Sequence, residues 1–217
     1  MKTTIITLIF MGSSLLTKAQ DTASSLMIEL DKLDSCMSAE ISPLSLAANF
    51  EMIGQTEKGN WLPYYYAAYC YVMDAFTQSD SAQIEQLLDQ STSSLAKADS
   101  LCGTSHPIDQ SEINCMKSLI ASARITVDPA NRGMQYGMEA SKMMSTAKTL
   151  CPDNPRVYLL EAQSLLYTPE AYGGGCENAR AILKTALEKY TLFTPSSELH
   201  PNWGQEEVER LLEECGK

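Results

Sequence analysis

The chain has 217 residues and a formal net charge of −11, with 27 acidic against 16 basic residues. An acidic surface of this kind repels phosphate backbones, so the composition argues against nucleic-acid binding. A chain of this length buries roughly 70% of its unfolded surface and can fold around a hydrophobic core without disulfides or metals.

Residues 1–19 have the pattern of a secretory signal peptide. Lys2 is followed by an apolar stretch, and small or short residues lead to Ala19. The apolar stretch, about a dozen residues, is too short to span a bilayer comfortably. We therefore expect cleavage after Ala19, a periplasmic or secreted protein, and no stable membrane insertion after cleavage. An uncleaved membrane anchor is the alternative.

Beyond this segment, the spacing of apolar residues is helical throughout and predicts an all-α chain. A helix pair is expected over residues 20–59, and a helical repeat region with a C-terminal capping helix over residues 60–217. Within the second region we expect helices over Trp61–Phe76, Ser79–Cys102, Asp109–Thr126, Pro129–Leu150, Pro155–Tyr167, Glu177–Phe193 and Gly204–Cys215. Glycines and prolines separate them.

A pattern of small and large apolar residues recurs along the chain. "STSSLAKADSLC" (from Ser91) and "ASKMMSTAKTLC" (from Ala140) each carry a small residue, a large apolar residue four positions later and a small one three positions after that. "ARAILKTALEKY" repeats these spacings from Ala179. Two helices that pack closely require this pattern on the face that they share.

The repeat resembles the second helix of the tetratricopeptide repeat (TPR) family, in which the same pattern is followed by proline. Ala140, Met144, Ala147 and Pro152 fit that spacing. The stretches "NPRVYLLEAQSLLYTPEAYGGG" and "PNWG" are similar to small secreted bacterial TPR proteins for which no activity is established. The resemblance implies a short right-handed α-solenoid of about three helical hairpins, preceded by a helix pair and closed by a capping helix.

The resemblance also implies a concave groove that binds a peptide. We expect this groove to be lined by Tyr65, Tyr69, Met73, Leu159, Gln163 and Tyr167, with Arg156 at its edge. Tyrosines would anchor the peptide, and Arg156 would bind a carboxylate. The alternative is that the tyrosines of "WLPYYYAAYCY" fill a curved core.

Three consecutive glycines, Gly173, Gly174 and Gly175, come before a helix-like run. A phosphate loop needs a preceding strand and a following Lys-Ser/Thr, whereas Cys176 and Glu177 follow here. We therefore predict a turn between two helices. A possible anion loop, which would bind a carboxylate or sulfate through its N–H groups, is the alternative.

The cysteines and histidines do not form a recognisable site. All 7 cysteines lie beyond Ala19, and an odd number in an oxidising compartment leaves at least one free or paired between chains. One or two disulfides and a dimer through a free cysteine are both consistent with this count. No CxxC pair, catalytic motif or clustered histidine is present, so we expect no metal, no cofactor and no enzymatic activity.

These observations favour a non-catalytic scaffold or adaptor of the cell envelope that binds a protein or peptide of unknown identity in the groove. The alternative is a small-ligand binding module or enzyme that uses a pocket near residues 167–176. An enclosed cavity would favour this alternative, and an open groove would favour the scaffold. A third possibility is a structural subunit that self-associates through its unpaired cysteine.

Overall fold

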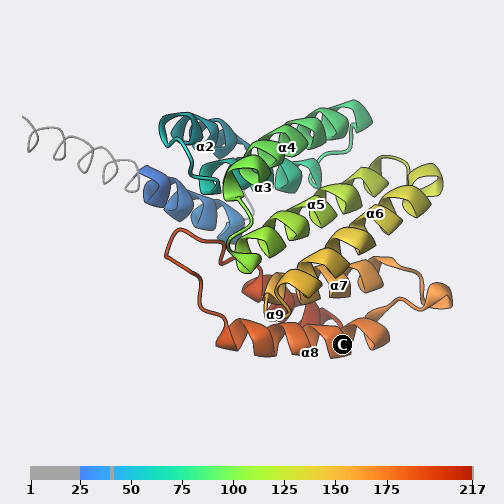
Figure 1. Cartoon of the computed structure of the whole chain (residues 1–217). Coiled ribbons are helices and arrows are strands. Elements are labelled where there is room, and N and C mark those ends of the chain that lie inside the picture. Colours follow the sequence, from blue (N-terminus) through green and yellow to red (C-terminus); the bar gives the residue numbers. More distant parts are fainter. Residues whose placement is uncertain (1–24, 40–41, 217) are drawn as a thin grey trace, which may run out of the picture.

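A computed structural model describes residues 25–39 and 42–216 (Figure 1). This part of the chain is helical and contains no strand, which confirms the predicted all-α class. The predicted signal peptide lies outside the described residues. Within them, none of the helices combines the length and the apolar character that a membrane span requires.

The predicted helices are present. The N-terminal helix is described over residues 25–38. The elements that follow are α2 (Leu44–Thr56), α3 (Leu62–Ala75), α4 (Ser81–Cys102), α5 (Pro107–Val127), α6 (Pro129–Leu150), α7 (Pro155–Tyr167), the short 3-10 helix η1 (Glu170–Tyr172), α8 (Cys176–Leu192) and α9 (Gln205–Glu214). From α3 onwards, no α-helix end differs from the prediction by more than two residues.

Capping residues explain why the helix ends could be predicted. Asp128 accepts a hydrogen bond from the backbone N–H of Asn131 at 3.2 Å, and a proline occupies the first turn of α6. Asn154 accepts one from the backbone N–H of Arg156 at 3.0 Å, again next to a proline at the start of α7. Both arrangements use a side-chain acceptor and a proline where the helix leaves N–H groups unpaired.

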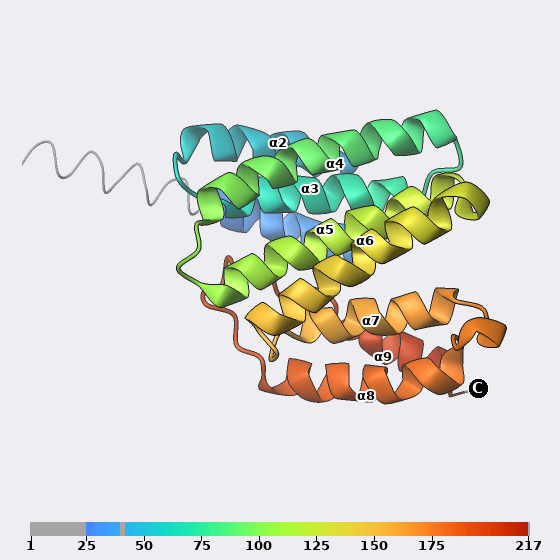
Figure 2. The same cartoon turned by 45° about the vertical axis from the view of Figure 1, so that its right-hand side comes forward.

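Consecutive helices from α2 to α6 pack side by side, and α7, α8 and α9 form a second group (Figures 1 and 2). One hydrophobic cluster joins the N-terminal helix to α2, α3, α4 and α5, and a smaller one fills the space between α7, α8 and α9. The two groups meet where α7 packs on α5 and α6. The right-handed solenoid stays a prediction.

The recurring small residues lie where neighbouring helices approach closely. Ala140 and Ala147 are buried on α6. Their backbone carbonyls accept hydrogen bonds from Ser118 at 3.0 Å and Ser111 at 2.9 Å, both on α5. The pattern "small, large, small" therefore reports tight packing of α5 on α6, which any helical hairpin of this closeness would require.

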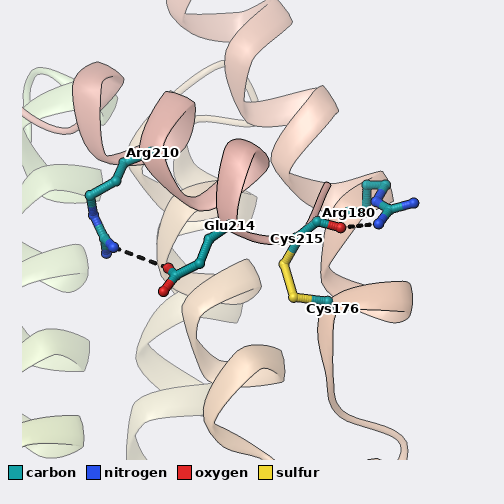
Figure 3. The surroundings of a disulfide bond; sticks show 5 residues. All are labelled: Cys176, Arg180, Arg210, Glu214 and Cys215. Carbon is teal, nitrogen blue, oxygen red and sulfur yellow. Dashed lines mark hydrogen bonds and ion pairs between the residues drawn. A yellow bond between two sulfur atoms is a disulfide. The ribbon is translucent and has the colours of Figure 1, made fainter. Parts of the chain in front are cut away.

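A disulfide joins the beginning of α8 to the end of α9 (Figure 3). It links Cys176 to Cys215, and Arg180 on α8 donates a hydrogen bond to the backbone carbonyl of Cys215. The C-terminal helix is thus tied to the α7–α8 pair. Five other cysteines are free thiols: Cys36, Cys70, Cys102, Cys115 and Cys151. The dimer through one of them stays a prediction.

Candidate functional site

The segment between α8 and α9, residues 193–204, is called the connector below. It runs along one side of the molecule from α8 back to α9 (Figure 1). Tyrosine hydroxyls bind its backbone: Tyr66 donates to the carbonyl of Leu199 at 2.9 Å, and Tyr190 donates to the carbonyl of Trp203 at 3.0 Å. The connector is therefore attached to α3 and α8 at defined points.

A cavity of about 990 Å³ lies among the N-terminal helix, α3, α5, α7, the connector and α9. Its volume is at the upper end of the range for small-molecule sites, about 300–1,000 Å³. Its large apolar and aromatic lining residues are Leu30, Leu33, Met37, Tyr66, Tyr69, Met73, Leu119, Leu159, Leu160 and Trp203. The rest of the lining is polar or charged, so the cavity suits a ligand with both an apolar surface and polar groups.

Two aromatic rings of the lining lie against each other. The ring centroids of Tyr69 and Trp203 are 5.1 Å apart, with an angle of 32° between the ring planes. Burial raises the pKa of Tyr66 and of Tyr69 far above its ordinary value, so both phenols stay neutral. The cavity thus offers uncharged aromatic surfaces, which suit a flat aromatic ligand.

The charged lining residues are mostly acidic. They comprise five carboxylates, one arginine and one histidine: Asp34, Glu198, Glu206, Glu207, Glu209, Arg210 and His200. Arg210 is already paired, at 2.7 Å with Glu207 and at 3.0 Å with Glu214. Burial, Asp31 and Glu206 together raise the pKa of Asp34. An anionic group of a ligand is therefore unfavourable on this side of the cavity.

The histidine of the lining has protein groups near both ring nitrogens, of which only the contact at Nδ1 is a hydrogen bond. Nδ1 of His200 is 2.7 Å from the hydroxyl of Ser197, and Nε2 is 3.5 Å from Oδ1 of Asp109. No cluster of three or more His, Cys, Asp or Glu side chains in the described chain is placed to hold a metal ion. The thioethers of Met37 and Met73 are the remaining soft donors in the lining.

The structure brings four of the seven predicted groove residues together. They are Tyr69, Met73, Leu159 and Gln163, which line the cavity. Tyr65 is fully buried and does not line it. Tyr167 is 82% exposed and also lies outside the lining. Tyr65 therefore belongs to the core, as the alternative interpretation expected, whereas Tyr69 belongs both to the core and to the cavity wall.

The predicted role of Arg156 at the edge of a groove is wrong. Its side chain is completely buried, and its Nε lies 2.7 Å and 2.8 Å from the two carboxylate oxygens of Glu112. Glu112 on α5 is also buried and accepts further hydrogen bonds from Asn154 and Tyr65. Arg156 faces inward because α7 packs on α5, where its counter-charge lies.

The glycine segment forms a turn. The N–H groups of Gly173 and Gly174 donate to backbone carbonyls within the loop, at 2.9 and 3.2 Å, and that of Gly175 donates to the carbonyl of Leu165 in α7 at 2.9 Å. A Cβ on Gly174 would lie 1.8 Å from the carbonyl oxygen of Thr168. These amides are used internally, which supports the turn over the anion loop. The cavity is lined by none of residues 167–176, so the pocket predicted there is in the wrong place.

Sequence analysis missed the contributions of Trp203 and of the N-terminal helix. A single tryptophan in the otherwise polar stretch "HPNWGQ" is the one signal that pointed to Trp203. Leu33 and Asp34 gave no signal, because they meet α9 only through the folding of the two ends of the chain.

Comparison with family models gives no match, and comparison with curated proteins gives none either. Among solved structures, the chain is similar to the HusA haemophore from Porphyromonas gingivalis, with a TM-score of 0.76 and 37% sequence identity. The similarity covers 89% of this chain and 92% of that protein. The predicted membership of the TPR family is therefore wrong, since its pattern of small residues reports helix packing alone. The extent and level of identity show that the chain belongs to the family of the HusA haemophore.

Proposed function

We propose that this chain is a haemophore that binds haem, or a closely related porphyrin, in the cavity between α3, α7 and α9. The observation that carries the proposal is the 37% identity with a haemophore over nearly the full length of both chains. The cavity of about 990 Å³, with its aromatic and apolar lining, supports it independently.

The same comparison overturns the prediction of a protein- or peptide-binding scaffold. A haemophore takes a small ligand, so the alternative of a small-ligand binding module agrees better with the comparison. The scaffold prediction also placed Tyr65 in an open groove, whereas its side chain is completely buried and does not line the cavity.

The lining suits the chemistry of a porphyrin. A porphyrin is a flat aromatic ring whose burial against Tyr69, Trp203 and the surrounding leucines would be favourable. Haem also carries two propionate groups, which are anionic at neutral pH. Because five carboxylates line the other side of the cavity and Arg210 is already paired, the propionates are expected to point to solvent.

Contacts with the ring, rather than a bond to iron, are expected to supply most of the affinity. Haem iron in proteins is held by His, Cys, Met or Tyr side chains. Tyr66 donates to the connector and Nδ1 of His200 contacts Ser197, which leaves Nε2 of His200, the hydroxyl of Tyr69 and the thioethers of Met37 and Met73 as candidates for iron. Haem would be a carried ligand here, not a cofactor for a reaction.

Export and transfer complete the proposal. The predicted signal peptide over residues 1–19 would deliver the chain to the periplasm or the exterior, where free haem is captured. A carrier must also release its ligand to a second protein, so we propose a receptor or acceptor protein as the partner, in place of the peptide first expected.

Titration with haemin tests this function. The chain without residues 1–19 should change the Soret absorption of haemin saturably, with a dissociation constant in the micromolar range or below. Metal-free protoporphyrin should bind within about tenfold of haemin, since ring burial rather than iron supplies the affinity. Absence of saturable binding for both ligands would overturn the proposal.

A pair of matched variants locates the site. Met73→Glu places a charge in the apolar lining, and we expect it to weaken haemin binding by at least about tenfold, because a buried charge beside the ring is costly. Met138→Glu makes the same change on α6, at a side chain that is 65% exposed and is not part of the cavity lining. Equal effects of the two variants would show that haemin binds elsewhere.

A further inference from the structure

A series of buried hydrogen bonds connects the core to the cavity lining. Arg156 binds both oxygens of Glu112, and the hydroxyl of Tyr65 donates to Oε2 of Glu112 at 3.0 Å. That same hydroxyl accepts a hydrogen bond from Nε1 of Trp203 at 2.9 Å. Of the four residues in this series of hydrogen bonds, only Trp203 lines the cavity.

The ion pair determines the direction of these hydrogen bonds. Asn154 donates to Oε1 of Glu112 at 2.8 Å, which fixes the carboxylate against α7. Burial and the neighbouring Glu112 raise the pKa of Tyr65 well above its ordinary value, so its phenol keeps its proton. Tyr65 must donate that proton to the carboxylate, and its oxygen is then oriented to accept from the indole of Trp203.

Other contacts hold the backbone of Trp203, and its ring packs on Tyr69 and lies 5.6 Å from the guanidinium of Arg156, but Tyr65 gives the ring its directional hydrogen bond. The backbone carbonyl accepts from Tyr190 at 3.0 Å and from Nη1 of Arg156 at 3.3 Å. The indole packs on Tyr69, a contact that tolerates sliding of one ring over the other. The hydrogen bond from Nε1 to Tyr65 is the directional contact that selects one orientation of the indole plane.

We propose that Tyr65 is a positioning residue for the ligand site, which fixes the indole of Trp203 so that Trp203 and Tyr69 form a preformed stacking surface. This inference rests on the proposed function. Tyr65 is completely buried and does not itself line the cavity, so it acts only through Trp203. A surface that is ordered before binding loses less conformational entropy when the ligand arrives.

Tyr65→Phe removes the hydroxyl and keeps the ring, so it tests the inference with little change in packing. We expect haemin and protoporphyrin to bind about 3- to 10-fold more weakly, the effect of losing one directional hydrogen bond. Tyr71→Phe is the matched control on the same helix, because Tyr71 is also buried and lies outside the cavity lining. It should bind within about twofold of the parent.

A spectroscopic readout separates positioning from a general loss of stability. In the ligand-free protein, the ¹⁵N–¹H signal of the Trp203 indole, assigned by its disappearance in Trp203→Phe, should move upfield in Tyr65→Phe. It should not move in Tyr71→Phe. An unchanged indole signal in Tyr65→Phe would overturn the inference, as would an altered signal with unchanged affinity.

A double-mutant cycle gives a second test that does not depend on one variant alone. Trp203→Phe keeps an aromatic ring but has no N–H to position, so adding Tyr65→Phe to it should weaken binding no further. Additive losses would overturn the positioning role. Failure of the parent to bind either ligand would instead remove the proposed function, while the indole signal would still report the hydrogen bond.

Discussion

The cavity lining comes from two regions that differ in charge and in how they are held. The middle of the chain, through α3, α5 and α7, contributes only uncharged side chains. The two ends, through the N-terminal helix, the connector and α9, contribute every charged one among the described lining residues. We call these the central lining and the terminal lining.

The central lining is continuous with the core, and the buried pair of Glu112 and Arg156 lies behind it. The terminal lining is held by the disulfide from Cys176 to Cys215 and by hydrogen bonds to the connector. The difference suggests a division of roles, in which the central lining provides a rigid aromatic surface and the terminal lining sets its charge. Substitutions can test the two roles separately.

Breaking the buried pair should have the largest effect. Glu112→Gln leaves the charge of Arg156 buried without its counter-charge, and we expect the free energy of unfolding to fall by about 3 to 5 kcal/mol. Urea denaturation measures this loss. Glu207→Gln removes an acid from the exposed pair with Arg210 in the terminal lining and should cost less than about 1 kcal/mol. Similar losses in both variants would contradict the division.

Removing the disulfide should have the next largest effect. Replacing both Cys176 and Cys215 by serine opens a loop with a sequence separation of 39 residues, and we expect a loss of about 3 kcal/mol in unfolding free energy. Hydrogen exchange should become faster mainly in α8 and α9. Cys102→Ser, at a free and half-buried thiol, is the control and should have a small effect. Uniformly faster exchange through α3 and α5 would show that the two linings are not held independently.

A single methyl group should disturb the junction between connector and α9. Gly204 has a φ of 109°, and a Cβ there would lie 2.2 Å from the hydroxyl oxygen of Tyr190 and 2.8 Å from Cδ2 of Leu159. We expect Gly204→Ala to lose about 2 kcal/mol in thermal or urea unfolding. Gly137→Ala is the control, and we expect it to stabilise the protein. Gly137 lies inside α6 and a Cβ there would have no neighbour within 4 Å, so the free energy of unfolding should rise by about 0.5 to 1 kcal/mol.

Local rules were sufficient to predict the helices but not the cavity. Helix ends depend on neighbouring residues, such as Asp128 before Pro129, so they are visible in the sequence. The ion pair of Glu112 and Arg156 joins positions 44 residues apart, and nothing local indicates that two such charges will meet in the core. The lining from Leu33 to Arg210 likewise depends on long-range packing.

The prediction of which side of α3 faces the groove was also partly wrong, for a physical reason. Tyr65 and Tyr69 are four residues apart and were assigned to one face, yet only Tyr69 reaches the cavity. Every residue from position 61 to 72 is buried, so this helix has no polar face from which an inward direction could be inferred. On α7, the same reasoning placed Tyr167 in the groove, whereas its side chain is exposed to solvent.

The smallest expected effect concerns the charge of the terminal lining. Burial, Asp31 and Glu206 raise the pKa of Asp34 above its ordinary value of 3.8. The native state therefore holds this proton up to a higher pH than the unfolded state does. As pH rises through the interval between the two values, ionisation of Asp34 lowers the free energy of unfolding, and the loss is complete above it.

Asp34→Asn should therefore stabilise the protein at pH 7 by a few tenths of a kcal/mol, a small gain because solvent screens this exposed carboxylate. Urea denaturation at pH 7 and about pH 2 measures the gain, which should vanish at the lower pH, where Asp34 is protonated in both states. An equal gain at both pH values would indicate packing rather than charge. At pH 7 the same variant should bind haemin about twofold more tightly, because one repulsive charge is removed while Tyr69 and Trp203 are unchanged.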